Sequence, residues 1–132
     1  MTRVNYDSNA PKLGWLLTVS KLLILFRLLQ ATGRLDERTD FEEFERHFTG
    51  SATNVIYWCG SAVELVQIFG SLIEICAVPY QRRHIQVLTM HFAQEDGSSF
   101  NPDSLRAMNS RIKKNFVGQL IKRLNEAFDE DR

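Results

Sequence analysis

Apolar residues between Trp15 and Phe48 follow a pattern that returns between Trp58 and Phe92. Aligning the two tryptophans sets an offset of 43 residues, at which other apolar positions coincide: Leu22 with Leu65, Leu25 with Ile68, Phe26 with Phe69, Leu29 with Leu72 and Leu35 with Val78. One extra residue then shifts the offset to 44, which aligns Phe41 with Ile85, Phe44 with Leu88, and His47-Phe48 with His91-Phe92. A repeat of this length is typical of a two-helix unit that buries its apolar face against a neighbouring copy. The pattern therefore predicts two helical repeats, at residues 13–50 and 55–93.

The first repeat carries the signals of two helices. Thr18 is a suitable N-cap, because its hydroxyl can accept a hydrogen bond from a free amide of the first turn, and Gly33 suits the left-handed position that closes a helix. We therefore expect a helix over about 19–32. Phenylalanines at positions 41, 44 and 48 then share one face of a second helix. The opposite face of that helix is acidic: Asp40, Glu42, Glu43 and Glu45.

The second repeat opens with the β-prone run 55–58, which we expect to form a minor strand, with the segment around Ser99-Phe100 as a candidate partner. Ser61 and Glu64 then form a capping box, Ser-x-x-Glu, in front of an apolar helical stripe. This is the firmest helix start in the chain. Several residues of the two repeats are accordingly predicted to be structural, as caps and core: Trp15, Trp58, Gly60, Ser61, Glu64 and Leu65.

The third helix should end at Val78-Pro79, because a residue before proline is disfavoured in the helical conformation. A fourth helix is expected over about 81–92, with Ile85, Leu88 and Phe92 facing inward. Asp96-Gly97 beyond it suits a tight turn.

One amphipathic helix is predicted over 101–129. Asn101 is a suitable cap and Pro102 suits the first helical position. Its apolar stripe advances in steps of three and four residues: Leu105, Met108, Ile112, Phe116, Leu120, Leu124 and Phe128. A face this broad can cover both repeats or pair with a second copy of the chain. The residues predicted to form such a homodimer interface are Phe116, Leu120, Leu124 and Phe128.

Length and composition indicate one domain. The chain has 132 residues, of which 44% are hydrophobic and 24% charged, ordinary values for a globular protein. We expect residues 1–132 to form a single all-α domain of two helix-turn-helix units, winged or not, with a flexible N-terminus at 1–12. The apolar run 13–29 contains Lys21 and Arg27, whose charges oppose membrane insertion, and no signal-peptide pattern is present. The expected location is the cytoplasm, with no membrane partner.

No recognised arrangement of catalytic or metal-ligating residues occurs in the sequence. Cys59 and Cys76 are expected to be reduced and buried. His47, His84 and His91 show no zinc-site spacing with the cysteines, and His47 and His91 are expected to have structural roles near helix ends. There is also no phosphate-binding loop, nucleophile elbow or dinucleotide fingerprint. The sequence therefore predicts a non-enzyme without cofactor, metal or small-molecule substrate.

The charge distribution indicates a local basic surface on a chain with no net charge. Six basic residues and no acidic one occur between positions 106 and 123: Arg106, Arg111, Lys113, Lys114, Lys122 and Arg123. Where the second helix of the first repeat is acidic, the fourth helix carries Arg82, Arg83, Gln86 and Thr89. An ordinary solvated surface explains these residues, and so does binding to double-stranded DNA. In the second interpretation the basic side chains, including Lys113 and Lys114, contact phosphates, while Gln86, with Thr89 beside it, lies at a base edge.

A short segment supports the DNA interpretation. Ile56-Tyr57-Trp58-Cys59-Gly60-Ser61, followed by Glu64-Leu65-Val66, resembles the RteC family, regulators of Bacteroides-type conjugative transposons, and the likeness extends over about residues 55–128. The resemblance implies an all-helical protein with a winged-helix-like DNA-binding part that regulates a mobile element. Only Trp58, Gly60, Ser61 and Leu65 match the family pattern, so no binding residue is carried over. The alternative function is a helical module for dimerisation or protein interaction that does not bind nucleic acid.

Overall fold

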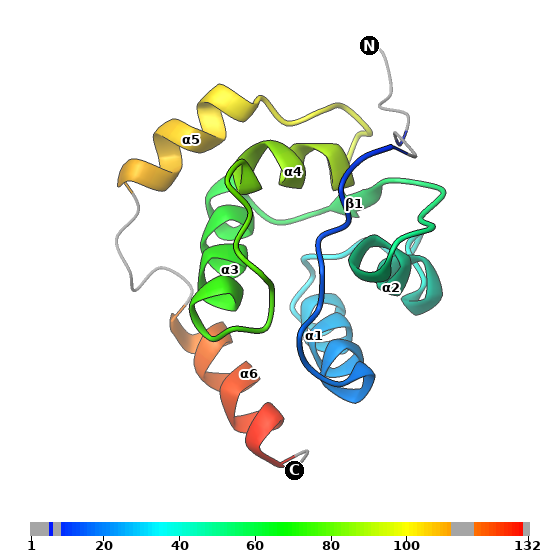
Figure 1. The fold of residues 1–132 in the computed structure, drawn as a ribbon, viewed down its shortest axis with the longest axis vertical. Coiled ribbons are helices and arrows are strands. Elements are labelled where there is room, and N and C mark those ends of the chain that lie inside the picture. Colours follow the sequence, from blue (N-terminus) through cyan, green and yellow to red (C-terminus); the bar gives the residue numbers. More distant parts are fainter. Residues whose placement is uncertain (1–5, 7–8, 112–117, 131–132) are drawn as a thin grey trace.

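The computed structural model describes residue 6, residues 9–111 and residues 118–130. Within these residues the fold is a mostly helical small domain with six helices and a two-stranded parallel sheet (Figure 1). The elements in chain order are α1 (Val19–Ala31), α2 (Phe41–Thr49), β1 (Ile56–Trp58), α3 (Ala62–Glu74), α4 (His84–His91), β2 (Phe92–Gln94), α5 (Pro102–Arg111) and α6 (Gly118–Glu130). The predominance of helix is confirmed, and the small sheet corrects the all-α class.

The N-caps predicted at Thr18, Ser61 and Asn101 are confirmed, since Asn101 Oδ1 accepts hydrogen bonds from the Asp103 and Ser104 amides at the start of α5. The Thr18 hydroxyl accepts a hydrogen bond from the Lys21 amide at 3.3 Å, at the start of α1. At the start of α3, the Glu64 amide donates to the Ser61 hydroxyl at 3.1 Å, and the Ser61 amide donates to the Glu64 carboxylate at 3.0 Å. These helices therefore begin where a side chain can satisfy an amide of the first turn.

Left-handed residues close both α1 and α3. Gly33 has φ of 77° and Cys76 has φ of 61°. The two amides that follow Gly33 donate to the Leu29 carbonyl at 2.9 and 3.3 Å, and the two that follow Cys76 donate to the Leu72 carbonyl at 2.9 and 3.2 Å. The predicted end of the third helix at Val78-Pro79 was wrong, because Cys76 takes the left-handed conformation despite its Cβ.

Trp15 and Trp58 make corresponding hydrogen bonds. The Trp15 indole donates to the Thr18 carbonyl at 2.8 Å, and the Trp58 indole donates to the Ser61 carbonyl at 2.9 Å. Each indole thus ties itself to the N-cap residue of the helix that follows. Trp58 is buried, whereas Trp15 is half-buried.

Two backbone hydrogen bonds cross between the halves of the chain. The Leu16 amide donates to the Ala77 carbonyl at 2.8 Å, and the Cys59 amide donates to the Arg34 carbonyl at 2.8 Å. In both cases the donor is the residue that follows a tryptophan. The acceptor lies in the segment after the first helix of the other half of the chain. Each half is therefore fastened to the other by backbone.

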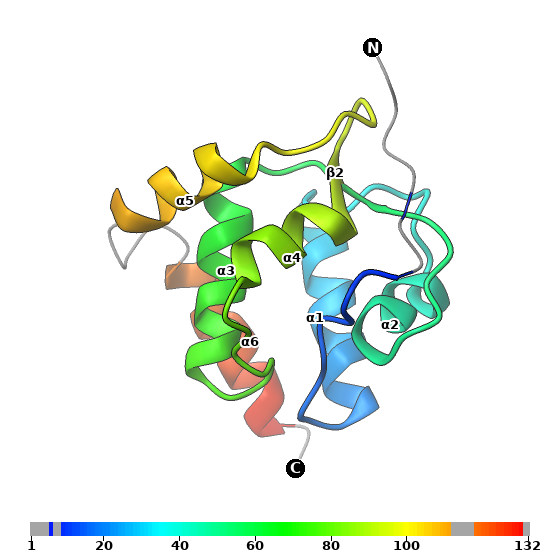
Figure 2. The same cartoon turned by 45° about the horizontal axis from the view of Figure 1, so that its top comes forward.

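The strands β1 and β2 pair in parallel, with Ile56 opposite Phe92 and Trp58 opposite Gln94. The suggested partner of β1 around Ser99 was wrong, since Ser99 forms an isolated antiparallel bridge with Ala93 instead. Figure 2 shows α4 running directly into β2. The first residue of that strand, Phe92, pairs with Ile56 of β1.

The segment before α4 is not helical, although a helix from residue 81 was predicted. α4 begins at His84, and the N-cap position is occupied by Arg83, whose side chain makes no capping hydrogen bond. Residues 82 and 83 lie in a turn.

Two C-terminal helices replace the single helix predicted over 101–129. α5 packs against α3 and α4, whereas α6 packs against α1 (Figure 1). Buried Leu105 on α5 and buried Leu124 on α6 both belong to the core. A continuous apolar stripe predicts which residues face inward, but it cannot specify that they face two different surfaces. Residues 112–117 lie outside the described part of the chain.

Aromatic rings join the two halves in one core. Phe48 of α2 stacks on Phe69 of α3 with ring centroids 6.2 Å apart, and Phe69 contacts Phe92 of β2 at 5.2 Å. The N-terminal segment joins this core, because Leu13 is buried and its amide donates to the His47 carbonyl at 2.9 Å. Within the described chain, no helix is both long enough and apolar enough to cross a lipid bilayer.

Candidate nucleic-acid interface

The residues predicted to contact DNA around the fourth helix differ in accessibility. Arg82 and Arg83 are exposed in the turn before α4, whereas Gln86 and Thr89 on α4 are half-buried. The Thr89 hydroxyl donates to the Gln86 carbonyl at 2.7 Å, so it is engaged within its own helix. α4 also packs against α5 and continues into β2. The helix is therefore less available to DNA than Arg82 and Arg83, which precede it.

The two arginines belong to a larger surface that the N-terminal segment completes. We call it the Tyr80 surface, and it consists of Lys12, Tyr80, Gln81, Arg82 and Arg83. The Gln81 side-chain amide donates to the Lys12 carbonyl at 2.9 Å, which holds Lys12 beside the turn. Tyr80 is 68% exposed, the largest exposure among the large hydrophobic residues described. An exposed ring beside three cations can therefore meet a ligand.

A close backbone contact keeps the N-terminal segment against this turn. Gly14 is buried with φ of +85°, and a Cβ at this position would lie 2.6 Å from Pro79 Cγ. No other residue type can be accommodated there without movement. Sequence reasoning identified Arg82 and Arg83 by their charge, but it missed Lys12 and Tyr80, because only the fold brings residue 12 beside residue 80.

Arg82 and Arg83 differ from four arginines of the domain that form ion pairs with carboxylates. The paired arginines are Arg34 with Glu64, Arg38 with Asp36 at 2.8 Å, Arg46 with Glu42 at 2.6 Å, and Arg106 with Asp103 at 2.6 Å. Within the described part of the chain, Lys12, Arg82 and Arg83 form no ion pair. Their charges are therefore not neutralised by the protein, as a phosphate-binding surface requires.

The remaining residues predicted to contact DNA, and those predicted to contact a dimer partner, lie in or near the C-terminal helices. Lys113, Lys114 and Phe116 fall outside the described residues. Leu120 lies on α6, of which the backbone is described at this position. Leu124 and Phe128 are buried in the core of the same chain, and the Phe128 ring lies 6.3 Å from the Trp15 ring. This packing corrects the prediction that these two side chains are exposed for a dimer partner.

The residues predicted to be structural are placed as caps and core. Leu65 is buried, and Glu64 both completes the α3 cap and pairs with Arg34. A Cβ at Gly60 would lie 3.1 Å from Trp58 Nε1. Residues 58–65 therefore contribute to the stability of the fold.

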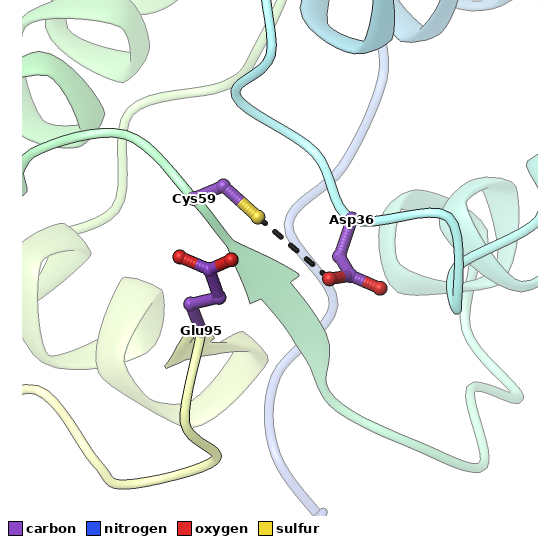
Figure 3. A group of neighbouring side chains, drawn as sticks. All are labelled: Asp36, Cys59 and Glu95. Atoms are coloured by element: carbon purple, nitrogen blue, oxygen red, sulfur yellow. Dashed lines mark hydrogen bonds between the residues drawn. The ribbon is translucent and has the colours of Figure 1, made fainter.

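A second cluster lies at the end of β1, where Asp36, Cys59 and Glu95 converge (Figure 3). One potential ligand atom from each residue lies within 4.8 Å of the others. The Cys59 thiol is directed at the Asp36 carboxylate, with 3.9 Å between sulfur and oxygen. This is the one group of three or more potential metal ligands in the described residues.

The electrostatics of this cluster do not favour a cation. Arg38 donates to both Asp36 carboxylate oxygens, at 2.8 and 3.3 Å, and these hydrogen bonds lower the pKa of Asp36. Burial, together with the charges of Glu95 and Asp36, raises the pKa of the Cys59 thiol. A metal would need the thiolate and would compete with the guanidinium for the carboxylate. Arg38 already supplies the positive charge, so the cluster is explained without a metal.

An open cavity of about 440 Å³ lies beside this cluster, between the start of α3 and the start of α5. Its wall includes Ser61 and Asn101, which are both N-cap residues. Helix N-termini attract anions when their amides are free. Here the amides are occupied, because Asn101 Oδ1 accepts from Asp103 N at 2.9 Å, and Ser61 and Glu64 cap each other. The ionisable side chains that line the cavity, Cys59 and Glu95, belong to the cluster described above.

Comparisons of the chain with protein-family models, curated proteins and solved structures gave no match.

Proposed function

We propose that this protein is a small non-catalytic regulator that binds nucleic acid through the Tyr80 surface. The observation that carries the proposal is the contrast in charge pairing. Arg82 and Arg83 are exposed, adjacent in the chain, and form no ion pair among the described residues, whereas Arg34, Arg38, Arg46 and Arg106 are paired. Arg27 on α1 and Arg123 on α6 are also exposed and form no ion pair among the described residues, but they have no Tyr80 beside them in the chain. Unpaired cations can release the counterions of a phosphate backbone, which supplies most of the affinity of such proteins.

The chemistry of the surface suggests a division of roles. Lys12, Arg82 and Arg83 contact phosphates, since guanidinium groups match phosphate oxygens in charge and geometry. Tyr80 offers a ring face on which a base can stack, a contact that tolerates any base and favours single strands. The partial burial of Gln86 limits its reach to a base edge. The proposal is therefore backbone binding with stacking, and sequence reading by α4 is not part of it.

This proposal is tested by fluorescence anisotropy with labelled duplex and single-stranded DNA at rising salt. Arg82→Ala and Arg83→Ala should each weaken binding and reduce the slope of log affinity against log salt by about 1. Tyr80→Ala should weaken single-strand binding by about 1–3 kcal/mol, with less effect on duplex. The matched control is Arg46→Ala, because Arg46 is accessible but paired with Glu42.

Two results would contradict nucleic-acid binding. One is the absence of binding by the unmodified protein at low salt. The other is an equal loss in Arg46→Ala and Arg82→Ala, which would indicate a nonspecific dependence on total charge.

We also infer that the chain is an internal duplication of a two-helix unit. The inference is supported by the matching bonds of Trp15 and Trp58 to N-cap carbonyls. It is supported further by the matching left-handed ends at Gly33 and Cys76. The two backbone bonds between the halves, from Leu16 to Ala77 and from Cys59 to Arg34, also join positions that correspond at an offset of 43. A pseudo-two-fold arrangement of the halves would produce such a pair of bonds.

A protein-interaction module is the second candidate function. Its specific support is the exposure of Leu16 and Val19, at 58% and 54%, around the start of α1. Of the flank of residues 116–128 that the sequence suggested, Leu124 and Phe128 are buried in the core, and the side chains of residues 116–121 lie outside the described ones. Sedimentation of the unmodified protein separates the candidates: self-association that Leu16→Ser abolishes, without any binding to DNA, would favour this one. The RteC resemblance favours the regulator, but the proposal above rests on the Tyr80 surface.

A further inference from the structure

His47 and His91 meet in the core at equivalent positions of the two halves. Both side chains are buried, and their Nδ1 atoms lie 2.7 Å apart. On the far side of each ring, Nε2 faces a backbone carbonyl oxygen. His47 Nε2 lies 2.6 Å from the Asn54 oxygen, and His91 Nε2 lies 2.6 Å from the Pro11 oxygen. All four ring nitrogens therefore have a partner at hydrogen-bond distance.

The partners determine how many protons the pair needs. A carbonyl oxygen can only accept, so both Nε2 atoms must carry hydrogen. A neutral imidazole carries one hydrogen on nitrogen. Two neutral rings would consequently direct the lone pairs of His47 Nδ1 and His91 Nδ1 at each other. Moving one hydrogen from Nε2 to Nδ1 only shifts the repulsion to a carbonyl. One additional proton between the Nδ1 atoms satisfies all four nitrogens at once.

The surroundings accept one positive charge and oppose two. Glu43 Oε2 lies 3.5 Å from His47 Nε2, and the Tyr6 ring contacts both imidazoles, with centroid distances of 4.9 Å to His47 and 5.5 Å to His91. Burial raises the pKa of Glu43, but hydrogen bonds from Thr53 and Asn54 lower it overall, so this carboxylate is ionised.

Burial opposes the charging of each ring. It lowers the pKa of both histidines, and the charge of His91 lowers that of His47 further, to about 4. These two pKa shifts by themselves would leave both rings neutral near pH 7. They disagree with the geometry of the four ring nitrogens, which needs one shared proton, and the inference below follows the geometry. A second proton would break the only bond between the rings.

We infer that His47 and His91 together take one proton from solvent, hold it as an N–H···N hydrogen bond between their Nδ1 atoms, and thereby link the two halves of the core. The inference is independent of nucleic-acid binding. A shared proton makes the stability of the domain depend on pH. Near pH 6.5 two unfolded histidines carry about one proton in total, the same number as the folded pair. Stability from this pair therefore peaks near that pH.

The sign follows from proton linkage. Above about pH 6.5 the folded pair holds more protons than the unfolded chain, so its contribution falls as pH rises. Below about pH 6.5 the unfolded chain holds more protons, so the contribution falls as pH decreases. Two permanently neutral, buried rings would behave differently: stability would rise with pH and then level off.

The test combines denaturant unfolding across pH with nitrogen-15 spectra of the full chain. The unmodified protein should show a stability maximum near pH 6.5 from this pair and a strongly deshielded bridging proton at neutral pH. His91→Asn places an amide near the Nδ1 position, which can donate to His47 without an added proton, so the maximum should disappear. His91→Gln instead places its amide near the Nε2 position, so it cannot form the hydrogen bond to His47 Nδ1. The control is His84→Asn, because His84 is half-buried outside the pair, and it should keep the maximum.

Two outcomes would overturn the inference. Unprotonated nitrogen signals from both Nδ1 atoms at pH 7, together with stability that only rises with pH, would show two neutral rings. A stoichiometric metal ion in the purified protein, released by a chelator, would show that a metal takes the place of the proton. The spectra of the unmodified protein decide the matter even if a variant fails to fold.

Discussion

Individual residues with positive φ determine where this chain turns and which segments can approach each other. Gly14 and Gly33 have nearly the same φ, 85° and 77°, but different surroundings. A Cβ at Gly14 would meet Pro79, whereas a Cβ at Gly33 has nothing within 4 Å. A comparison of substitutions at these two positions therefore separates the cost of backbone strain from the cost of close packing.

Replacing Gly14 with alanine should destabilise the domain more than the same change at Gly33. Gly33→Ala carries the cost of a left-handed alanine, about 1–2 kcal/mol. Gly14→Ala adds the displacement of Pro79, for which overpacking typically costs about 1–3 kcal/mol more. Urea unfolding at one pH measures both. Equal losses would mean that the segment before α1 is not held against Pro79.

Some features of the candidate interface can be predicted from the local sequence, and others depend on the fold. The two adjacent charges of Arg82 and Arg83 are visible in the sequence, and the structure adds that both side chains are exposed in the turn before α4. The availability of Gln86 could not be predicted, since it depends on α5 lying over α4. Lys12 joins the surface through one hydrogen bond from Gln81, across 69 positions of the chain.

At the scale of elements, the starts of α1 and α3 were predictable, whereas the start of α4 and the end of α3 were not. A cap needs only the hydroxyl of Thr18 or Ser61 and an amide three residues later, so local sequence is enough. The end of α3 required Cys76 to adopt a left-handed conformation, which no propensity favours. The partner of β1 likewise depended on α4 leading into β2.

Ser61→Ala should lower the free energy of unfolding by about 1 kcal/mol, because the first turn of α3 loses a side-chain acceptor. Thr18→Ala should have a similar or smaller effect, since its bond to Lys21 is longer, 3.3 Å against 3.1 Å. The control is Ser20→Ala at an exposed position within α1, which should leave stability unchanged or raise it slightly. Thermal unfolding by circular dichroism measures all three, and an unchanged Ser61→Ala would contradict the capping role.

At the scale of the whole molecule, the C-terminal helices cover the core in place of a second copy of the chain. α6 lies along α1 and contributes Leu124 and Phe128 to the core (Figure 1). These are the side chains that an amphipathic pattern equally allows at a dimer interface. The structure assigns them to the same chain.

Leu124→Ala should therefore destabilise the monomer by about 2–5 kcal/mol, the usual cost of a cavity at a buried leucine. The loss should be independent of protein concentration. A matched control is Leu16→Ala, because Leu16 is 58% exposed and its truncation should cost little. Denaturant unfolding over a wide range of concentrations checks both. A midpoint that rises with concentration would indicate that Leu124 acts between chains.

The sequence by itself determined which residues are apolar and face inward, where α1 and α3 begin, and where unneutralised cations occur, because these properties depend on side-chain chemistry and near neighbours. The tertiary structure alone decided that the final stripe forms two helices on different surfaces, that Lys12 lies beside Gln81, and that His47 meets His91. Such contacts depend on chain segments far apart in sequence, whose approach is fixed by the packing of the whole core.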